Sequence, residues 1–227
     1  MEPFVVTRQV RGVFVIAMNR PIRKNAMDTE MLQALIGAFD QEESAVVITG
    51  GPGAFSSGAD VSEKIDADGT DRRMKLFCDL YELVTTFRKP VVAAIDGPCI
   101  GGGAEIAGAC DLRVGTEGAS IRFPGAQFGI PIGAARLVRL IGLSHAKDLL
   151  MTTRTMGGGE AYRMGYLNRL VSTQALEKEA IELALLMDGN PGVSKQKQMI
   201  DESAGLTAAI RAENRALMRW QRSARAN

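Results

Sequence analysis

Three consecutive glycines followed by a glutamate form the part of this sequence best suited to chemistry. The glycines are Gly101 to Gly103, and Glu105 stands two positions beyond them. Before them, the apolar run 91–95 predicts a buried strand, and after them the small residues of 104–110 predict a tightly packed helix. Glycines at a strand-to-helix turn let a ligand approach the backbone, and the free N–H groups of a helix's first turn carry partial positive charge. Such a turn can hold an anion or a developing oxyanion.

Plainer explanations of the same stretch stay open at this point. The glycines can serve only to let strand and helix pack closely, and Glu105 can serve only to complement the helix dipole. Two phosphate-binding fingerprints are excluded, because no G-x-G-x-x-G fits residues 101–108 and no glycine in the chain precedes Lys-Ser or Lys-Thr. What remains is a glycine turn with a carboxylate just beyond it.

Composition and charge limit the function classes that this chain can serve. Its 227 residues can bury a substantial core, as one domain or as one domain with a small appendage. A net charge of +1 and 5% aromatic residues give no general argument for binding nucleic acid or a membrane. Three cysteines without a C-x-x-C pair and a single histidine make a poor zinc set, so no metal is expected. With no apolar run of about 18 residues and no secretory leader, we expect a soluble, cytoplasmic protein.

The first part of the chain predicts a hairpin followed by a helix. Residues 4–19 alternate apolar and polar side chains on either side of Arg11-Gly12, which is typical of a β-hairpin. A polar loop then leads into an amphipathic helix that ends at about residue 40. Its N-cap is predicted at Asp28 or Thr29, because both side chains can accept a hydrogen bond from the first turn.

The middle of the chain predicts parallel strands joined by helices. A strand at 45–49, a helix at 74–87 and the strand at 91–95 follow in that order, and this order is the signal for parallel β-structure with helical crossovers. The polar connection 63–71 is expected to be exposed and mobile. Further helices are expected at about 134–141, 144–151 and 159–164, and only helices are expected after residue 174, with a break at 189–192.

Five segments of the chain carry a family resemblance. In order they are NRPIRKNAMD, GAFSSGADVSE, KPVVAAIDGPCIGGGAEIAGACDLRV, FPGAQFGIPIGAARLVRLIG and EAYRMGYLNRLV. Together they resemble the crotonase family, the enoyl-CoA hydratase/isomerase superfamily. The likeness covers nearly the whole chain, and five ordered segments make it specific for the fold. It is much less specific for the reaction.

The resemblance implies an α/β fold and an assembly. The fold is a crotonase-like spiral of ββα units, in which helices flank two near-perpendicular sheets. Residues 1–190 would form this core with its acyl-CoA site, and residues 191–227 would form a C-terminal helical segment, shorter than is usual for the family. Members assemble as homotrimers or dimers of trimers, so the same is expected here.

The resemblance also implies an oxyanion hole for the carbonyl of an acyl-CoA thioester. On the family pattern its donors are the backbone N–H groups of Ala59 and Gly102. An enolate forming at the thioester oxygen needs preorganised donors, and losing one typically costs ~3–4 kcal/mol of barrier. The missing side chains of Gly58 and Gly102 would leave the approach clear. Coenzyme A arrives as part of the substrate, so no separate cofactor is expected.

Glu105 matches the first of the two glutamates that enoyl-CoA hydratases place over the substrate's α and β carbons. The second stands in a segment resembling FGxPE, where this chain has Phe123-Pro124-Gly125, and the glycine cannot transfer a proton. One carboxylate and one water can in principle mediate hydration, which is the reaction we expect, and one carboxylate also suits 3-enoyl to 2-enoyl isomerisation. A catalytically weak acyl-CoA binding protein and the family's other enolate chemistries stay open as alternatives.

The resemblance places the contacts to coenzyme A in two loops. In the first loop, residues would flank the adenine and pantetheine, and the two basic ones suit phosphates, although loop cations are as often simply solvated. In the second loop, the backbone would line the thioester and pantetheine end, while the side chain of Asp60 is expected to order the loop. The first loop contributes Ile22, Arg23 and Lys24, and the second contributes Gly58, Ala59, Asp60, Val61 and Ser62.

Overall fold

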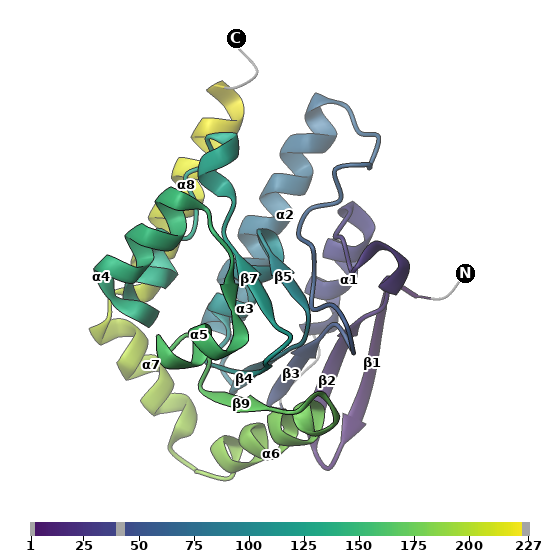
Figure 1. Ribbon diagram of the computed structural model, residues 1–227, viewed down its shortest axis with the longest axis vertical. Coiled ribbons are helices and arrows are strands. Elements are labelled where there is room, and N and C mark those ends of the chain that lie inside the picture. The colour runs from purple at the N-terminus through teal and green to yellow at the C-terminus, as the bar shows by residue number, and fades with distance from the viewer. Residues whose placement is uncertain (1–2, 40–43, 224–227) are drawn as a thin grey trace.

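Six short strands build the large sheet of the molecule. In the computed structural model, which describes residues 3–39 and 44–223, they follow the order β1-β2-β3-β4-β6-β9 (Figure 1). β1 and β2 form the predicted antiparallel hairpin, and every later pair is parallel. The strands are β1 Val5–Val10, β2 Val13–Met18, β3 Val46–Thr49, β4 Val91–Ile95, β6 Leu112–Thr116 and β9 Arg169–Val171.

Successive side chains of the central strands point to opposite faces of the sheet and pack into two separate hydrophobic cores. In β4, Val91, Ala93 and Ile95 lie in a large core with residues of α1, α2 and α3, while Val92 and Ala94 pack against α6 on the other face. Because both faces are covered, the strand is a continuous apolar run. The helices are α1 Thr29–Phe39, α2 Ala67–Thr86, α3 Gly102–Ala109 and α6 Leu176–Asp188.

A second, three-stranded sheet leads directly into the glycine turn. Its order is β5-β7-β8, with β5 parallel to β7 and β7 antiparallel to β8. Where the sequence predicts only a turn after residue 96, the structure has β5, because a three-residue strand is too short for a periodicity to indicate it. The strands are β5 Pro98–Ile100, β7 Ser120–Arg122 and β8 Met156–Gly157.

The remaining described helices fold back over the core. α8 lies against both α2 and α4, so the end of the chain covers helices that precede and follow the glycine turn (Figure 1). α6 and α7 are separated at the predicted break, residues 189–192. The remaining helices are α4 Ala134–Thr152, α5 Gly158–Arg163, α7 Val193–Ser203 and α8 Leu206–Ser223, and short 3-10 turns occupy Pro21–Arg23, Gly125–Phe128 and Thr173–Ala175.

Two helix boundaries differ from the sequence prediction. α2 begins at Ala67, inside the connection predicted to be exposed and mobile, because the side chain of Asp66 accepts a hydrogen bond from Gly69 N at 2.6 Å and caps the helix. The two helices predicted at 134–141 and 144–151 are the halves of α4, which kinks at Gly142. α1 is capped by Asp28, as expected, but its predicted end at residue 40 lies outside the described residues.

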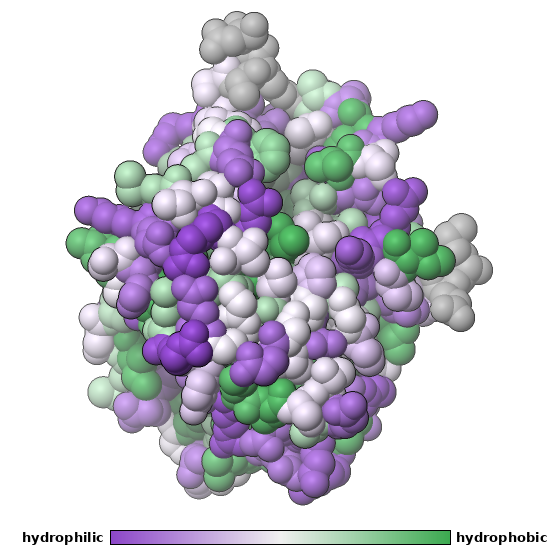
Figure 2. Space-filling model, viewed as in Figure 1, coloured by the Kyte–Doolittle hydropathy of each residue, from purple (hydrophilic) through white to green (hydrophobic). Residues whose placement is uncertain are grey.

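Hydrophobic residues are spread over the face of the molecule that Figure 2 shows. The face shown in Figure 2 is mostly hydrophilic or neutral, and its hydrophobic residues are scattered among the others. Such scattering is normal for a folded chain. Within residues 3–39 and 44–223, no helix combines the length and the apolar character needed to cross a bilayer.

Candidate active site

The turn that contains Ala59 lies beside the start of α3 because a short parallel bridge joins them. Ser56 N donates to Pro98 O, and Ile100 N donates to Ser56 O, both at 2.9 Å. The segment from Ser56 therefore runs alongside β5, and the chain leaves both segments on the same side. A methyl group placed on Gly58 would lie 3.3 Å from the amide nitrogen of Gly102, which shows how closely the two turns approach.

The amides of Ala59 and Gly102 both lack an acceptor within the described parts of the chain. A second parallel bridge explains the first amide: Met27 N donates to Gly58 O, and Asp60 N donates to Met27 O, each at 2.8 Å. In a parallel bridge these bonds flank the central residue, whose own N–H points the other way. Gly102 is the first residue of α3, where the helix offers its amide no partner. Ala59 is exposed and Gly102 is half-buried.

Both turns require glycine. Gly58 has φ +92°, and a methyl group on it would lie 2.8 Å from Ile100 O. A methyl group on Gly102 would lie 2.6 Å from the ring of Phe77 on α2. Any larger residue would have to displace a backbone carbonyl or a core aromatic ring, so the approach to the two amides depends on missing side chains.

Asn25 holds the segment that leads to Ala59 in place through hydrogen bonds, a role that was not predicted from the sequence. Its buried side-chain amide donates to Gly50 O and Ala54 O, each at 2.9 Å. Its own carbonyl accepts from the Ser56 hydroxyl at 2.7 Å, and that hydroxyl accepts from Gly58 N at 3.1 Å. The backbone of Asn25 has φ +53°, a conformation that asparagine tolerates better than most residues.

The two loops predicted to hold coenzyme A lie next to each other. Ser57 N donates to Lys24 O at 2.9 Å, and the Ser57 hydroxyl donates to Arg23 O at 3.3 Å. The side chains of Ile22, Arg23 and Lys24 are exposed, and Ile22 retains 97% of its accessible surface. Val61, in the second loop, is 93% exposed. Both loops therefore present side chains to solvent beside the Ala59 turn.

Asp60 orders its loop through its side chain. The carboxylate accepts from Ser62 N at 2.9 Å and from the Ser62 hydroxyl at 2.6 Å, and it pairs with Arg20 at 3.1 Å. The hydrogen bonds from Ser62, together with the charge of Arg20, hold the pKa of Asp60 below its ordinary value. An ionised, fully engaged carboxylate of this kind fixes a loop and is a poor proton carrier.

Glu105 is buried in a cluster of three charged side chains from three helices. Its Oε2 accepts from Arg136 Nε at 3.0 Å and from Arg136 Nη2 at 2.6 Å. The same Nη2 lies 3.3 Å from Glu213 Oε1, and Glu213 Oε2 accepts from Ala135 N, at the start of α4, at 2.9 Å. One guanidinium therefore sits between a carboxylate of α3 and a carboxylate of α8, with the ring of Tyr81 4.9 Å from the centre of the guanidinium group.

The environment of Glu105 suits proton transfer near neutral pH. The pKa of Glu105 is raised to about 7, chiefly because burial disfavours the charged form; Arg136 opposes this rise and the charge of Glu213 adds to it. Its Oε1 has no hydrogen-bond partner among the described residues. A carboxyl group with one free oxygen and a pKa near the working pH can accept and return a proton efficiently.

Gly125, the position at which the family resemblance predicted the second glutamate, is closed in by its own loop. A methyl group on it would lie 2.8 Å from Ile130 O and 3.1 Å from Cγ2 of Ile132. Ile130 N also donates to Gly125 O at 2.9 Å, which fixes this turn. The position thus lacks a carboxylate and also lacks the room for one.

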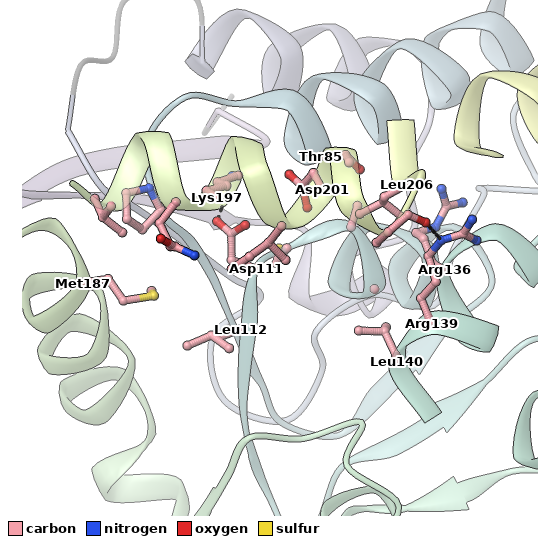
Figure 3. Close-up of a pocket in the computed structure, with 18 residues that line it drawn as sticks. Thr85, Asp111, Leu112, Arg136, Arg139, Leu140, Met187, Lys197, Asp201 and Leu206 are labelled. Carbon is pink, nitrogen blue, oxygen red and sulfur yellow. Dashed lines mark hydrogen bonds and ion pairs between the residues drawn. The ribbon is translucent and has the colours of Figure 1, made fainter. Parts of the chain in front are cut away.

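A separate cavity of about 410 Å³ lies at the opposite end of α3, between α3, α4 and α7 (Figure 3). Arg136, whose guanidinium pairs with Glu105, is one of the residues that line this cavity. Figure 3 also shows Lys197 pointing toward Asp111, with which it forms an ion pair of 2.8 Å. Neither Ala59 nor Gly102 is among its described lining residues, so the cavity is distinct from the two amides.

The partners of Glu105 were not anticipated from the sequence. Arg136 carries a usable signal, because it stands between Ala135 and Leu137 on the buried side of an apolar helix, and a buried arginine requires acceptors. Glu213 carries no local signal, since it is one of several charged residues on α8 and its neighbours in sequence do not mark it as buried.

Comparison with known proteins agrees with this architecture. The family model for enoyl-CoA hydratase/isomerase matches residues 8–221. A probable enoyl-CoA hydratase of Rhizobium meliloti is 34% identical and covers 92% of this chain and 84% of its own length. The short-chain-enoyl-CoA hydratase of Clostridium acetobutylicum is 33% identical over 87% of this chain and 80% of its own.

Solved structures show the same fold. The enoyl-CoA hydratase/isomerase of Xanthobacter autotrophicus superposes with a TM-score of 0.85 at 28% identity, covering 95% of this chain and 86% of that one. The enoyl-CoA hydratase of Bacillus anthracis superposes with a TM-score of 0.84 at 28% identity, covering 94% and 90%. With a family match over nearly all of its length and these neighbours in both sequence and fold, the chain belongs to the enoyl-CoA hydratase/isomerase family of the crotonase superfamily.

Proposed function

We propose that the amides of Ala59 and Gly102 together bind the thioester oxygen of an acyl-CoA and that Glu105 carries the proton. The observation that carries this proposal is the pair of amides without acceptors in two adjoining turns. One of them, the amide of Gly102, lies one helical turn before Glu105, a buried carboxyl with a raised pKa. The amides would stabilise the negative charge that develops on the oxygen as an enolate forms. Backbone donors suit this role because they cannot rotate away.

The reaction that we favour is hydration of a 2-enoyl-CoA. Relatives named enoyl-CoA hydratase, at 33–34% identity, support it. In this reaction Glu105 takes a proton from a water molecule, whose oxygen bonds to C3 as the C2=C3 electrons move toward the thioester. The enolate oxygen rests on the two amides until Glu105 returns the proton to C2, so one carboxyl group serves as both base and acid.

Isomerisation of a 3-enoyl-CoA to a 2-enoyl-CoA is a second candidate, and the closure of the loop at Gly125 favours it. In this reaction Glu105 removes a proton from C2, the same enolate forms, and the proton is delivered to C4 as the double bond moves. No water has to be positioned. A site with one proton carrier therefore performs it without the second carboxylate.

Coenzyme A would be held as part of the substrate by the loop of Ile22, Arg23 and Lys24 and by the backbone of residues 58–62. The proximity of the two loops and the exposure of their side chains support this placement. The homotrimer or dimer of trimers and the cytoplasmic location implied by the family resemblance stay predictions. Light scattering of the purified protein measures the first, and cell fractionation measures the second.

A panel of short, medium and long 2-enoyl-CoAs and 3-enoyl-CoAs tests the proposal. Following the absorbance of the conjugated thioester distinguishes hydration, which removes the absorbance from 2-enoyl substrates, from isomerisation, which creates it from 3-enoyl substrates. The Glu105→Gln variant should lose turnover and still bind acyl-CoA. Binding without turnover in the wild-type protein would refute the enzymatic proposal and leave a catalytically weak acyl-CoA binding protein. Unchanged activity in the variant would exclude Glu105 from the mechanism.

A further inference from the structure

We infer that Glu213 is a positioning residue that acts on Glu105 through Arg136, so that helix α8 takes part in proton transfer at the active site. The inference rests on the proposed role of Glu105. It concerns a residue that the sequence does not mark and that lies on the last described helix of the chain.

The contacts fix the orientation of the guanidinium and, through it, of Glu105. Arg136 donates both Nε and Nη2 to the same oxygen of Glu105, while Nη2 also faces Glu213. The other oxygen of Glu213 is held by the amide of Ala135, so Glu213 cannot turn away without leaving that amide unsatisfied. A planar guanidinium held at two edges has one orientation. The result is that Oε2 of Glu105 is engaged while Oε1 stays free.

The charges explain why the second carboxylate matters for chemistry. The side chains of Arg136, Glu105 and Glu213 retain only 1%, 2% and 8% of their accessible surface, so water screens their interactions weakly. Arg136 lowers the pKa of Glu105 and so opposes the effect of burial. Glu213 competes for the same nitrogen and repels the charge on Glu105, which keeps Glu105 able to accept a proton.

The other titratable groups around Glu105 are neutral near pH 7. Tyr81 approaches from α2, Cys99 from β5 and Tyr166 from the segment after α5, while Cys78 of α2 lies near Arg136 and Glu213. Burial raises the pKa of each of these phenols and thiols above its ordinary value. In the described part of the chain, Arg136 and Glu213 are therefore the charges that set the basicity of Glu105.

The pH profile of the Glu213→Gln variant tests the inference. Glutamine keeps the shape and an acceptor for Ala135 N, but it removes the negative charge. The two carboxylate oxygens contact the same nitrogen and so lie within about 6 Å of each other, and at an effective dielectric constant of about 20 the lost repulsion corresponds to about 1 to 2 pH units. We expect the acidic limb of kcat/KM to move to lower pH by that amount, because Glu105 ionises more easily.

Two control variants separate this role from a purely structural one. Glu82→Gln removes one negative charge from a different contact of α8, in which Glu82 of α2 pairs with Arg211, and it should leave the acidic limb in place. Glu213→Asp keeps the charge and should restore most of the wild-type profile. If Glu213 only joined α8 to α4, Glu213→Gln would lower thermal stability but leave the acidic limb of kcat/KM at its wild-type pH. That result would overturn the inference.

A readout that does not need turnover keeps the inference separate from the proposed function. The Glu105 carboxyl can be titrated by carbon-13 NMR in glutamate-labelled protein, with its signal assigned by Glu105→Gln. If the wild-type protein shows no turnover, the proposed function fails, yet a lower pKa of Glu105 in Glu213→Gln still supports the coupling. If that variant does not fold, the wild-type signals decide: coupled, two-step titrations of Glu105 and Glu213 support the inference, and independent single-step curves overturn it.

Discussion

Replacing Glu105 with glutamine should make the protein more stable relative to wild type as the pH rises. The folded-state pKa of Glu105 is about 7, raised by burial from an ordinary value of 4.5. A carboxyl group with a raised pKa contributes stability that is fully present below the unfolded pKa and is lost as pH rises through the folded pKa. With 1.36 kcal/mol for each unit, the loss between pH 4.5 and 7 is about 3 kcal/mol. Glutamine keeps an acceptor for Arg136 and cannot ionise, so the variant escapes this loss.

Urea unfolding of the two proteins at several pH values between about 4.5 and 8 measures the effect. Groups common to both proteins cancel in the difference between the two stability curves. The difference should be small near pH 4.5 and should grow by about 3 kcal/mol in favour of the variant as Glu105 ionises in the wild type. Glu82→Gln, which removes an exposed carboxylate, should give a nearly flat difference curve.

A difference curve that stays flat for Glu105→Gln would refute this reasoning. It would mean that Arg136 outweighs burial and keeps Glu105 ionised over the whole range. If measurements extended below pH 4.5 showed the wild type gaining stability on the variant as the pH rises toward 4.5, the folded-state pKa of Glu105 would be depressed. In either case Glu105 would be a poor proton acceptor at neutral pH.

Three further substitutions probe the frame around the site. Gly58→Ala forces a side chain into a strained conformation 2.8 Å from Ile100 O; we expect turnover to fall about 100-fold or more and stability to fall by about 1–3 kcal/mol, as measured by steady-state kinetics and urea unfolding. Gly125→Glu should cost about 1–3 kcal/mol of stability without increasing hydration, because its loop leaves no room; a faster hydratase would contradict this. Asn25→Ala removes the donor to two buried carbonyls and places alanine at φ +53°, so it should cost about 2–4 kcal/mol in a urea melt; a loss below about 0.5 kcal/mol would show that the turn holds without it.

The local sequence pattern was sufficient to predict an element where that element's own residues determine its structure. The strand β4, Val91–Ile95, follows from its apolar run, and the structure has it where it was predicted. The helical segments predicted at 134–141 and 144–151 are present too, but they form one helix, α4, kinked at Gly142. The strand β5 was missed because its three residues are held by pairing with β7 and Ser56, which are distant in sequence. Propensity alone does not specify such a strand.

The electrostatic partners of the candidate site were beyond sequence reasoning for the same reason. Glu105 was predicted from its place after the glycines, but its burial and its raised pKa depend on Arg136 and Glu213, which belong to other helices. Asn25 illustrates the point at the other turn, since a polar loop residue gave no sign that its side chain would reach carbonyls about 30 positions away. Contacts of this kind arise only when helices and loops pack together.

The bridge between Ser56 and β5 has a consequence for how a ligand meets the two amides. Because the backbone on either side of Ser56 is bonded to Pro98 and Ile100, both turns belong to one mechanical unit. We therefore expect the two turns to move together, so that the distance between the amide nitrogens of Ala59 and Gly102 varies little. A ligand oxygen therefore meets two amide donors that are already in position, and little conformational entropy is lost when it binds to them.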